Sequence, residues 1–303
     1  AVRRPDNEIE LKVEDYKCVF GNAKFLKYPL IRGVVSFVDS LVVGTKCLMY
    51  SAEIAGDEED EEDKQKNAAL SEEELAAKKA KEDKQFKWLL YVTVAVSIVV
   101  SVAAFMLLPY ALASLCRRVG ASEFAVTIVE AFVKLALFMG YMLLISRMKD
   151  IQRTFMYHGA EHKCINCIEH GMDLTVENVR KSSRLHKRCG TSFLLIVMII
   201  SIFFFMFIHV DSRVLRLVLR LVLIPVIAGV SFEFIRLAGR SDNALINLLS
   251  KPGLLLQHIT TKEPEDDMIE VGIASVEAVF DWKTYVEEIR QEDSREHDIS
   301  GSN

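Results

Sequence analysis

The chain has 303 residues, of which 51% are hydrophobic and 26% are charged, and its mean hydropathy is +0.21. This balance excludes an ordinary soluble domain, because long apolar blocks alternate with strongly charged ones. The formal net charge of −5 gives no overall basic surface, so we expect no specific nucleic-acid partner. The six cysteines are scattered and do not form the pattern of a small disulfide-rich secreted domain, so we expect reduced thiols or metal ligands.

The first element predicted along the chain is a half-buried β-strand. Ile9, Leu11 and Val13 alternate with charged residues, which is the period of a strand that has one face in a core. Residues 4–7 before it have the composition of a turn. We therefore expect residues 1–20 to hold part of a β-hairpin whose first strand lies mostly upstream of the sequence given.

Two segments of opposite character follow. Residues 28–55 are mostly apolar, but Arg32, Asp39 and Lys46 recur every seven residues and so share one helical face. Because three charges make a membrane span costly, we predict an amphipathic helix that lies in the interface or packs on other helices. Residues 57–87 are a charged low-complexity tract, which we interpret as a solvated linker or a helix extension.

Four further segments have the length and apolarity of membrane-spanning helices. They are residues 88–115, 124–146, 193–208 and 214–235. Lysine and arginine are concentrated between the second and third of them, in residues 147–192, and are sparse in the short turns on the other side. The positive-inside rule therefore places residues 147–192 and both termini in the cytoplasm.

The C-terminal segment, residues 236–303, is predicted to contribute to a small cytoplasmic α+β unit. Apolar and polar residues alternate across residues 268–274, which predicts a second strand that could pair with the N-terminal hairpin. A final helix is expected over residues 275–290, followed by a polar tail. The predicted fold class is therefore mainly α: a polytopic membrane protein with about four transmembrane helices, an N-terminal amphipathic helix and this α+β unit.

The most informative motif is the run His158-Gly159-Ala160-Glu161-His162, which comes soon after a predicted span. Residues at i and i+4 share one face of a helix, so His158 and His162 can hold one metal ion from the same side. The pattern H-x-x-E-H is the inverted form of the zinc-protease motif, and Glu161 is its carboxylate. The position indicates metal chemistry, or a metal-stabilised fold, at a membrane surface.

Two further ligand-type residues follow in the same segment. Thr175 is predicted to cap a short helix over residues 176–187, which carries His186, and Cys189 comes three residues later. A helix–loop–helix hairpin would bring both residues back toward the histidine pair. The predicted metal ligands are thus His158, His162, His186 and Cys189. Mixed nitrogen and sulfur ligands favour zinc over magnesium or calcium.

The number of ligands decides which kind of site this is. Four protein ligands make a closed structural site, whereas three ligands and a water make a catalytic one, with Glu161 as the natural general base. Histidine pairs at this spacing also occur in helices that bind no metal. The pair Cys164-x-x-Cys167 is a weaker signal, because a single C-x-x-C is common by chance.

Charges within the predicted spans offer other interpretations. Glu130 and Lys134 are four residues apart in the second span, and the simplest reading is that they neutralise each other. Glu233 and Arg236, near the end of the fourth span, could instead reach the metal segment and support its histidines.

Five stretches of the chain are long and distinctive: YPLIRGVVSFVDSLVVGTKCLMYSAE, RTFMYHGAEHKCI, LTVENVRKSSRLHKRCGTSFLLIVM, AGVSFEFIRLAGR and KPGLLLQHITTKEPEDDMIEVGIASV. They resemble the bacterial YqhQ-like membrane proteins over nearly the whole chain. The resemblance implies a multi-pass protein of the bacterial cytoplasmic membrane, described in that family as metal-dependent and of unknown activity. Carried over residue by residue, it implies a site at His158, Glu161, His162, His186 and Cys189.

Three functions compete. The first is a zinc-dependent membrane hydrolase in which His158, His162 and either His186 or Cys189 bind the metal. The second is a zinc-stapled membrane scaffold or assembly factor that engages a protein-export or ribosomal partner at the cytoplasmic face. The third is a transporter using Glu130 and Lys134, which ranks last because no inverted repeat is visible. In every case the lipid bilayer is a partner.

Overall fold

The computed structural model describes residues 1–21, 26, 28–55, 72–208, 210, 212–241 and 243–300. Within these ranges the chain is mainly helical, with one small two-stranded sheet, which confirms the predicted fold class. The chain divides into two compact units. The larger unit comprises Ala1–Ala55 and Met142–Asn303, and the smaller comprises Gly56–Tyr141.

Besides most of α5 (Glu123–Ile145), the smaller unit contains one long helical segment. It runs through α3 (Glu72–Val102), a π-helical turn η2 (Ala103–Leu107) and α4 (Leu108–Arg118). The turn lies just before Pro109, which has no backbone N–H and cannot continue a regular ladder. The charged tract, predicted as a solvated linker or a helix extension, is helical from Glu72 onward, and its residues 57–71 lie outside the described ranges.

Among the residues described, four helices are long and apolar enough to cross a membrane. By length and composition they are Ile31–Ala52, Tyr91–Arg118, Glu123–Ile145 and Val218–Ala238. The last three overlap predicted spans. The predicted span at 193–208 is the apolar helix α8 (Gly190–Met206), whose 17 residues are about 26 Å long, slightly less than a typical hydrocarbon core. The first was predicted to be interfacial.

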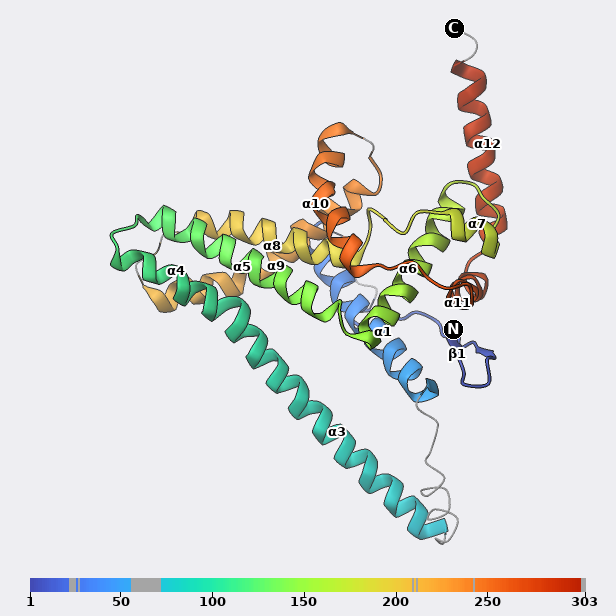
Figure 1. Ribbon diagram of the computed structural model, residues 1–303, viewed down its shortest axis with the longest axis horizontal. Coiled ribbons are helices and arrows are strands. Elements are labelled where there is room, and N and C mark those ends of the chain that lie inside the picture. Colours follow the sequence, from blue (N-terminus) through green and yellow to red (C-terminus); the bar gives the residue numbers. More distant parts are fainter. Residues whose placement is uncertain are drawn as a thin grey trace. The chain divides into compact units, whose positions relative to one another are not determined.

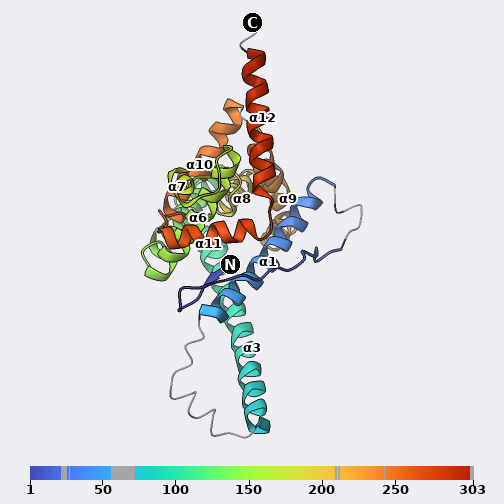
Figure 2. The same ribbon diagram turned by 90° about the vertical axis from the view of Figure 1, so that its right-hand side faces the viewer.

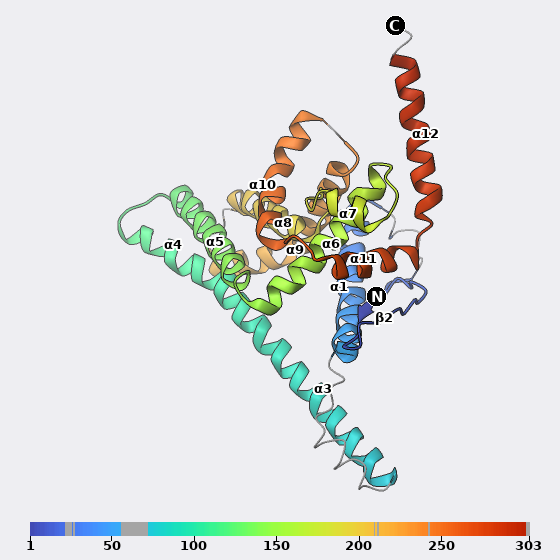
Figure 3. The ribbon, with the colours of Figure 1, turned by 45° about the vertical axis from the view of Figure 1, so that its right-hand side comes forward.

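Within the larger unit, three apolar helices pack closely: α1 (Ile31–Ala55), α8 and α9 (Arg213–Ala238). A Cβ on Gly33 of α1 would lie only 3.0 Å from the Cα of Gly229 on α9, so the two backbones approach closely. Next to Gly33, Arg32 donates at 2.6 Å to Glu233, which lies one turn along α9 from Gly229. α10 (Ala244–Thr260) then runs across the direction shared by α8 and α9 (Figures 1 and 3).

A second layer of the larger unit carries the histidine motif. It consists of α6 (Lys149–Glu169), the short α7 (Val176–Lys181), α11 (Asp266–Glu277) and α12 (Trp282–Ser300). α11 lies beside α6 and α7 (Figure 2). The core between them includes Cys164, Val179 and Ile269, all of which are fully buried.

The predicted strand at 268–274 is wrong, because these residues belong to α11. Asp266 and Asp267 occupy the first turn of that helix, where carboxylates are favoured by the helix dipole. Gly272 then lets α11 approach α6, since a Cβ there would lie 3.0 Å from the sulfur of Cys164. The predicted helix at 275–290 is accordingly divided between α11 and α12.

The N-terminal hairpin forms, but it is short. β1 (Val2–Arg3) pairs antiparallel with β2 (Ile9–Glu10), so the predicted strand ends before Leu11. Arg3 donates to Glu270 at 2.7 Å and to the Asp267 carbonyl at 2.8 Å. The hairpin therefore contacts the C-terminal segment as predicted, although the contact is with a helix.

Candidate metal centre

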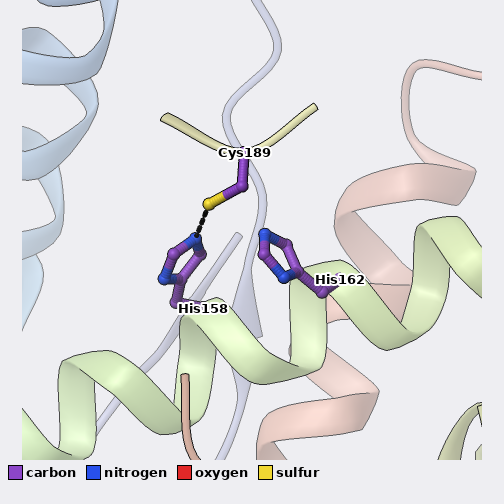
Figure 4. Close-up of side chains that lie close together, drawn as sticks. All are labelled: His158, His162 and Cys189. Carbon is purple, nitrogen blue, oxygen red and sulfur yellow. Dashed lines mark hydrogen bonds between the residues drawn. The ribbon is translucent and has the colours of Figure 1, made fainter. Parts of the chain in front are cut away.

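Three ligand-type side chains converge at the junction of α6 and α8. His158 and His162 lie one turn apart on α6, and Cys189 is the N-cap of α8 (Figure 4). One donor atom from each residue lies within 4.8 Å of the other two. The Cys189 sulfur is 3.3 Å from Nε2 of His158, and the two imidazole centroids are 4.4 Å apart.

Both imidazoles are oriented by the backbone. Nδ1 of His158 lies 2.9 Å from the carbonyl oxygen of Thr260, and Nδ1 of His162 lies 2.7 Å from that of Arg184. A carbonyl can only accept, so each Nδ1 carries the proton that it donates. In a neutral ring, Nε2 then keeps its lone pair, which is the arrangement found around metal-binding histidines.

The segment after α10 locks α6 in place. The amide of Lys262 donates to the Phe155 carbonyl at 2.9 Å, and the Lys262 carbonyl lies against Gly159. A Cβ at Gly159 would stand 2.0 Å from that oxygen. Glycine between the two histidines is therefore what allows Thr260 to reach His158.

The electrostatics of the group are those of a thiolate beside imidazoles. Burial raises the pKa of the Cys189 thiol, but hydrogen bonds from His158 and His162 outweigh it and lower the pKa to about 5. For His158, burial lowers the pKa, and the interaction with Cys189 reverses the direction, so its pKa is raised. A sulfur that is anionic at neutral pH is the form that binds metals.

Two hydroxyl groups complete the surroundings of Cys189. Oγ1 of Thr191 lies 3.1 Å from the Cys189 sulfur and 3.1 Å from Oγ1 of Thr260. Thr260 therefore contacts both sides of the group, through its carbonyl at His158 and its hydroxyl at Thr191. The sequence did not predict the contacts of these threonines or of the Arg184 carbonyl, because neither backbone acceptors nor contacts between distant residues are visible in a local sequence pattern.

His186 is not part of this group among the residues described. The predicted helix at 176–187 ends at Lys181, although Thr175 caps it as expected by accepting from the Asn178 amide. His186 follows in the loop before α8, where Nε2 is 3.1 Å from Glu169 and the backbone is held at both N–H and C=O by Gln257. The predicted four-ligand set is thus reduced to three in this geometry.

Glu161 lies on the exposed side of α6, outside the converging donor atoms. It is close enough to raise the pKa of His158 electrostatically. Cys164 and Cys167 are buried in the α6–α7–α11 core, and burial raises the pKa of Cys164 to about 12. They are packing residues in this fold.

Glu233 and Arg236 are predicted to support the histidines, but the ion pairs that the structure describes for Glu233 lie elsewhere. Glu233 accepts from Arg32 of α1 at 2.6 Å, and Arg236 is 4.0 Å away. The backbone carbonyls described above orient the two histidines, which is the role predicted for Glu233 and Arg236. Glu130 is buried on α5 (Glu123–Ile145), the helix that also carries Lys134.

The chemistry of the donors and the spacing of one donor pair agree with a zinc site. Zinc binds sulfur at about 2.3 Å and nitrogen at about 2.0 Å, so two ligands of a tetrahedral site stand roughly 3.6 Å apart. The 3.3 Å between the Cys189 sulfur and Nε2 of His158 is near that value. His162 and Cys189 are also almost fully buried, which limits competition from water.

Comparison with known proteins supports the resemblance. Residues 28–282 match a family described as protein of unknown function DUF1385. Over 259 residues the chain is 38% identical to the uncharacterized protein YqhQ of Bacillus subtilis strain 168, covering 82% of this chain and 76% of that relative. No solved structure matches significantly. From the family match and this identity, the chain belongs to the DUF1385 family of proteins of unknown function.

Proposed function

We propose that this protein is a zinc-dependent membrane hydrolase whose metal is held by His158, His162 and Cys189 at the cytoplasmic membrane face. One observation carries the proposal: three donor atoms converge, and both histidines have Nδ1 committed to backbone carbonyls. Simple packing of two histidines and a cysteine does not require that common orientation, whereas metal binding does.

The ligand count favours catalysis over a purely structural role. Catalytic zinc sites use three protein ligands and leave one position open, whereas structural sites are usually closed by four. A bound zinc ion would act as a Lewis acid and lower the pKa of a coordinated water. Glu161 is the proposed general base, because it is the carboxylate of the motif and is electrostatically coupled to His158.

A structural role is the second candidate, and a specific observation favours it. The three donors come from α6 and from Cys189 before α8, so a bound ion would cross-link segments 31 residues apart in sequence. The end of α10 would be held to the same site indirectly, through the hydrogen bond between Thr260 and His158. Such a zinc-stapled scaffold could present the basic segment at 147–192 to a protein-export or ribosomal partner.

Metal analysis tests the centre itself. Protein purified in detergent without chelator should contain about one zinc ion per chain. His158→Ala and Cys189→Ser should lose it, whereas His258→Ala, an exposed histidine on α10, should keep it. His186→Gln should also keep it, because His186 faces Glu169. A folded wild-type protein without metal, or full zinc content in both ligand variants, would refute the proposal.

Cobalt substitution separates the two roles without a known substrate. Cobalt(II) in a site with an open position changes its visible bands when azide or thiocyanate binds, whereas a closed four-ligand site does not. We expect the bands to shift on anion addition, and to lose their sulfur-to-metal charge-transfer component in Cys189→Ser. Bands that anions leave unchanged would contradict a hydrolase and favour the scaffold.

A further inference from the structure

α10 carries a row of exposed apolar side chains. Its members are spaced as one face of a helix and are Leu245, Leu248, Leu249, Pro252 and Leu255. The four leucines expose 52 to 66% of their surface. The buried residues Gly253 and Gln257 face α8 instead. One side of α10 is therefore packed on protein, and another side is a row of leucines that no described residue covers.

The position of α10 is set by the ends of two apolar helices. It begins after a five-residue linker, 239–243, that follows the end of α9, so its start lies within roughly 20 Å of that end. Further along, Gln257 donates to the hydroxyl of Ser192 at 2.7 Å, and Gly253 is in close contact with the same residue. Ser192 lies in the first turn of α8. Because α8 and α9 form a helical hairpin, both anchors lie at the same end of it.

The direction of α10 differs from that of the hairpin. Figures 1 and 3 show it running across α8 and α9 rather than along them. α10 has 17 residues, which include Lys251 and Pro252, and it is not among the described helices that are long and apolar enough to cross a membrane. A helix held at the end of a membrane hairpin, lying across it, is parallel to the membrane plane.

We propose that α10 is an interfacial helix whose leucine row is inserted into the lipid bilayer. Amphipathic helices of this kind bury their apolar face at the boundary between headgroups and acyl chains. The proposal rests on the membrane location of α9 within the proposed function. It adds a consequence for the metal centre: Thr260, the last residue of α10, hydrogen-bonds His158, so the centre is held near headgroup depth and open to substrates that arrive along the interface.

Nitroxide labels on the full chain in liposomes test this directly. In a background lacking Cys18, Cys47 and Cys116, single labels are placed at Leu248→Cys and Leu255→Cys. Val222→Cys, exposed on α9, is the matched bilayer control, and Glu288→Cys, exposed on α12, is the water control. Power saturation then compares collisions with oxygen, which concentrates in lipid, and with a water-soluble nickel chelate.

We expect both α10 labels to favour oxygen, as the α9 label does. If the α9 label is in lipid but the α10 labels behave like Glu288→Cys, the interfacial helix is refuted and the membrane protein stands. If the α9 label is itself in water, the membrane location fails. Low collision rates with both reagents, together with dipolar broadening, would show that a second copy covers the row, which also overturns the proposal.

Discussion

Gly159 separates the two histidines of the candidate centre, and the fold leaves no room for a side chain there. Replacing it with alanine would place a Cβ 2.0 Å from the Lys262 carbonyl oxygen, a backbone atom that cannot rotate away. The segment after α10 must then shift, at a cost of about 1–3 kcal/mol typical of overpacking. The same shift withdraws the Thr260 carbonyl from His158. We predict that Gly159→Ala lowers the thermal midpoint and weakens zinc retention together.

Gly140→Ala is the matched control. Gly140 is also within a helix, α5, but a Cβ there meets nothing within 4 Å. Alanine is favoured over glycine inside helices by about 0.5–1 kcal/mol, so this variant should be as stable as the wild type or slightly more so. Equal midpoints and equal zinc contents for the two variants would show that the Lys262 contact does not hold the centre.

At the residue level, spacing predicted only part of the centre. His158 and His162 follow from helical periodicity, and Cys189 from its position shortly after a predicted helix. His186 lies outside the donor group, because the helix ends at Lys181 and Gln257 then holds the backbone of His186 at its N–H and C=O. That contact joins residues 71 positions apart, and local sequence patterns carry no information about it.

At the level of elements, α1 shows why composition alone does not assign a span. Its first 22 residues satisfy the length and hydropathy of a membrane helix. Yet Asp39, in the middle, is buried and accepts from the Val19 amide at 2.9 Å and from the Tyr16 hydroxyl. Tyr50 donates to Glu10 at 2.7 Å. An extended, charged segment therefore follows the second half of α1, and exposed extended backbone does not occur in hydrocarbon.

These contacts favour the interfacial placement predicted for α1, and labelling can test it. In nanodiscs both membrane faces are open to water, so orientation does not matter. Among single-cysteine variants, Cys47, which is exposed in the second half of α1, should react readily with a charged maleimide. Val222→Cys on α9 should react at least tenfold more slowly, because lipid covers it. Protection of Cys47 equal to that of the α9 cysteine would instead make α1 a span.

The wrong strand at 268–274 and the correctly predicted apolar helices differ in how many structures their sequence patterns allow. Long apolar segments have one stable solution in a membrane, so their helical state could be read from length. A seven-residue alternation is compatible with a strand or with a helix whose buried side faces a partner. Here the partner, α6, decided the outcome, since Ile269 and Met268 complete its core.

At the level of the whole molecule, the candidate centre joins parts of the larger unit that are distant in sequence. α6 supplies two donors and the start of α8 supplies the third, while α10 and the loop before α8 supply the orienting carbonyls. A ligand that binds only the folded state stabilises it by RT ln(1 + [L]/Kd), which is about 4 kcal/mol at a thousandfold excess over Kd. An ion at this junction should therefore control the stability of the larger unit.

We accordingly predict that a strong chelator lowers the thermal midpoint of the wild-type protein in detergent and that added zinc restores it. Cys189→Ser should start at the lower midpoint and respond to neither reagent, because it lacks one donor and the ion is already absent. Glu161→Gln should behave as the wild type, since its carboxylate lies outside the donor group. The measurement is differential scanning fluorimetry with and without chelator. An equal chelator effect on the wild type and on Cys189→Ser would place the stabilising ion elsewhere and leave the three converging side chains as a polar packing cluster.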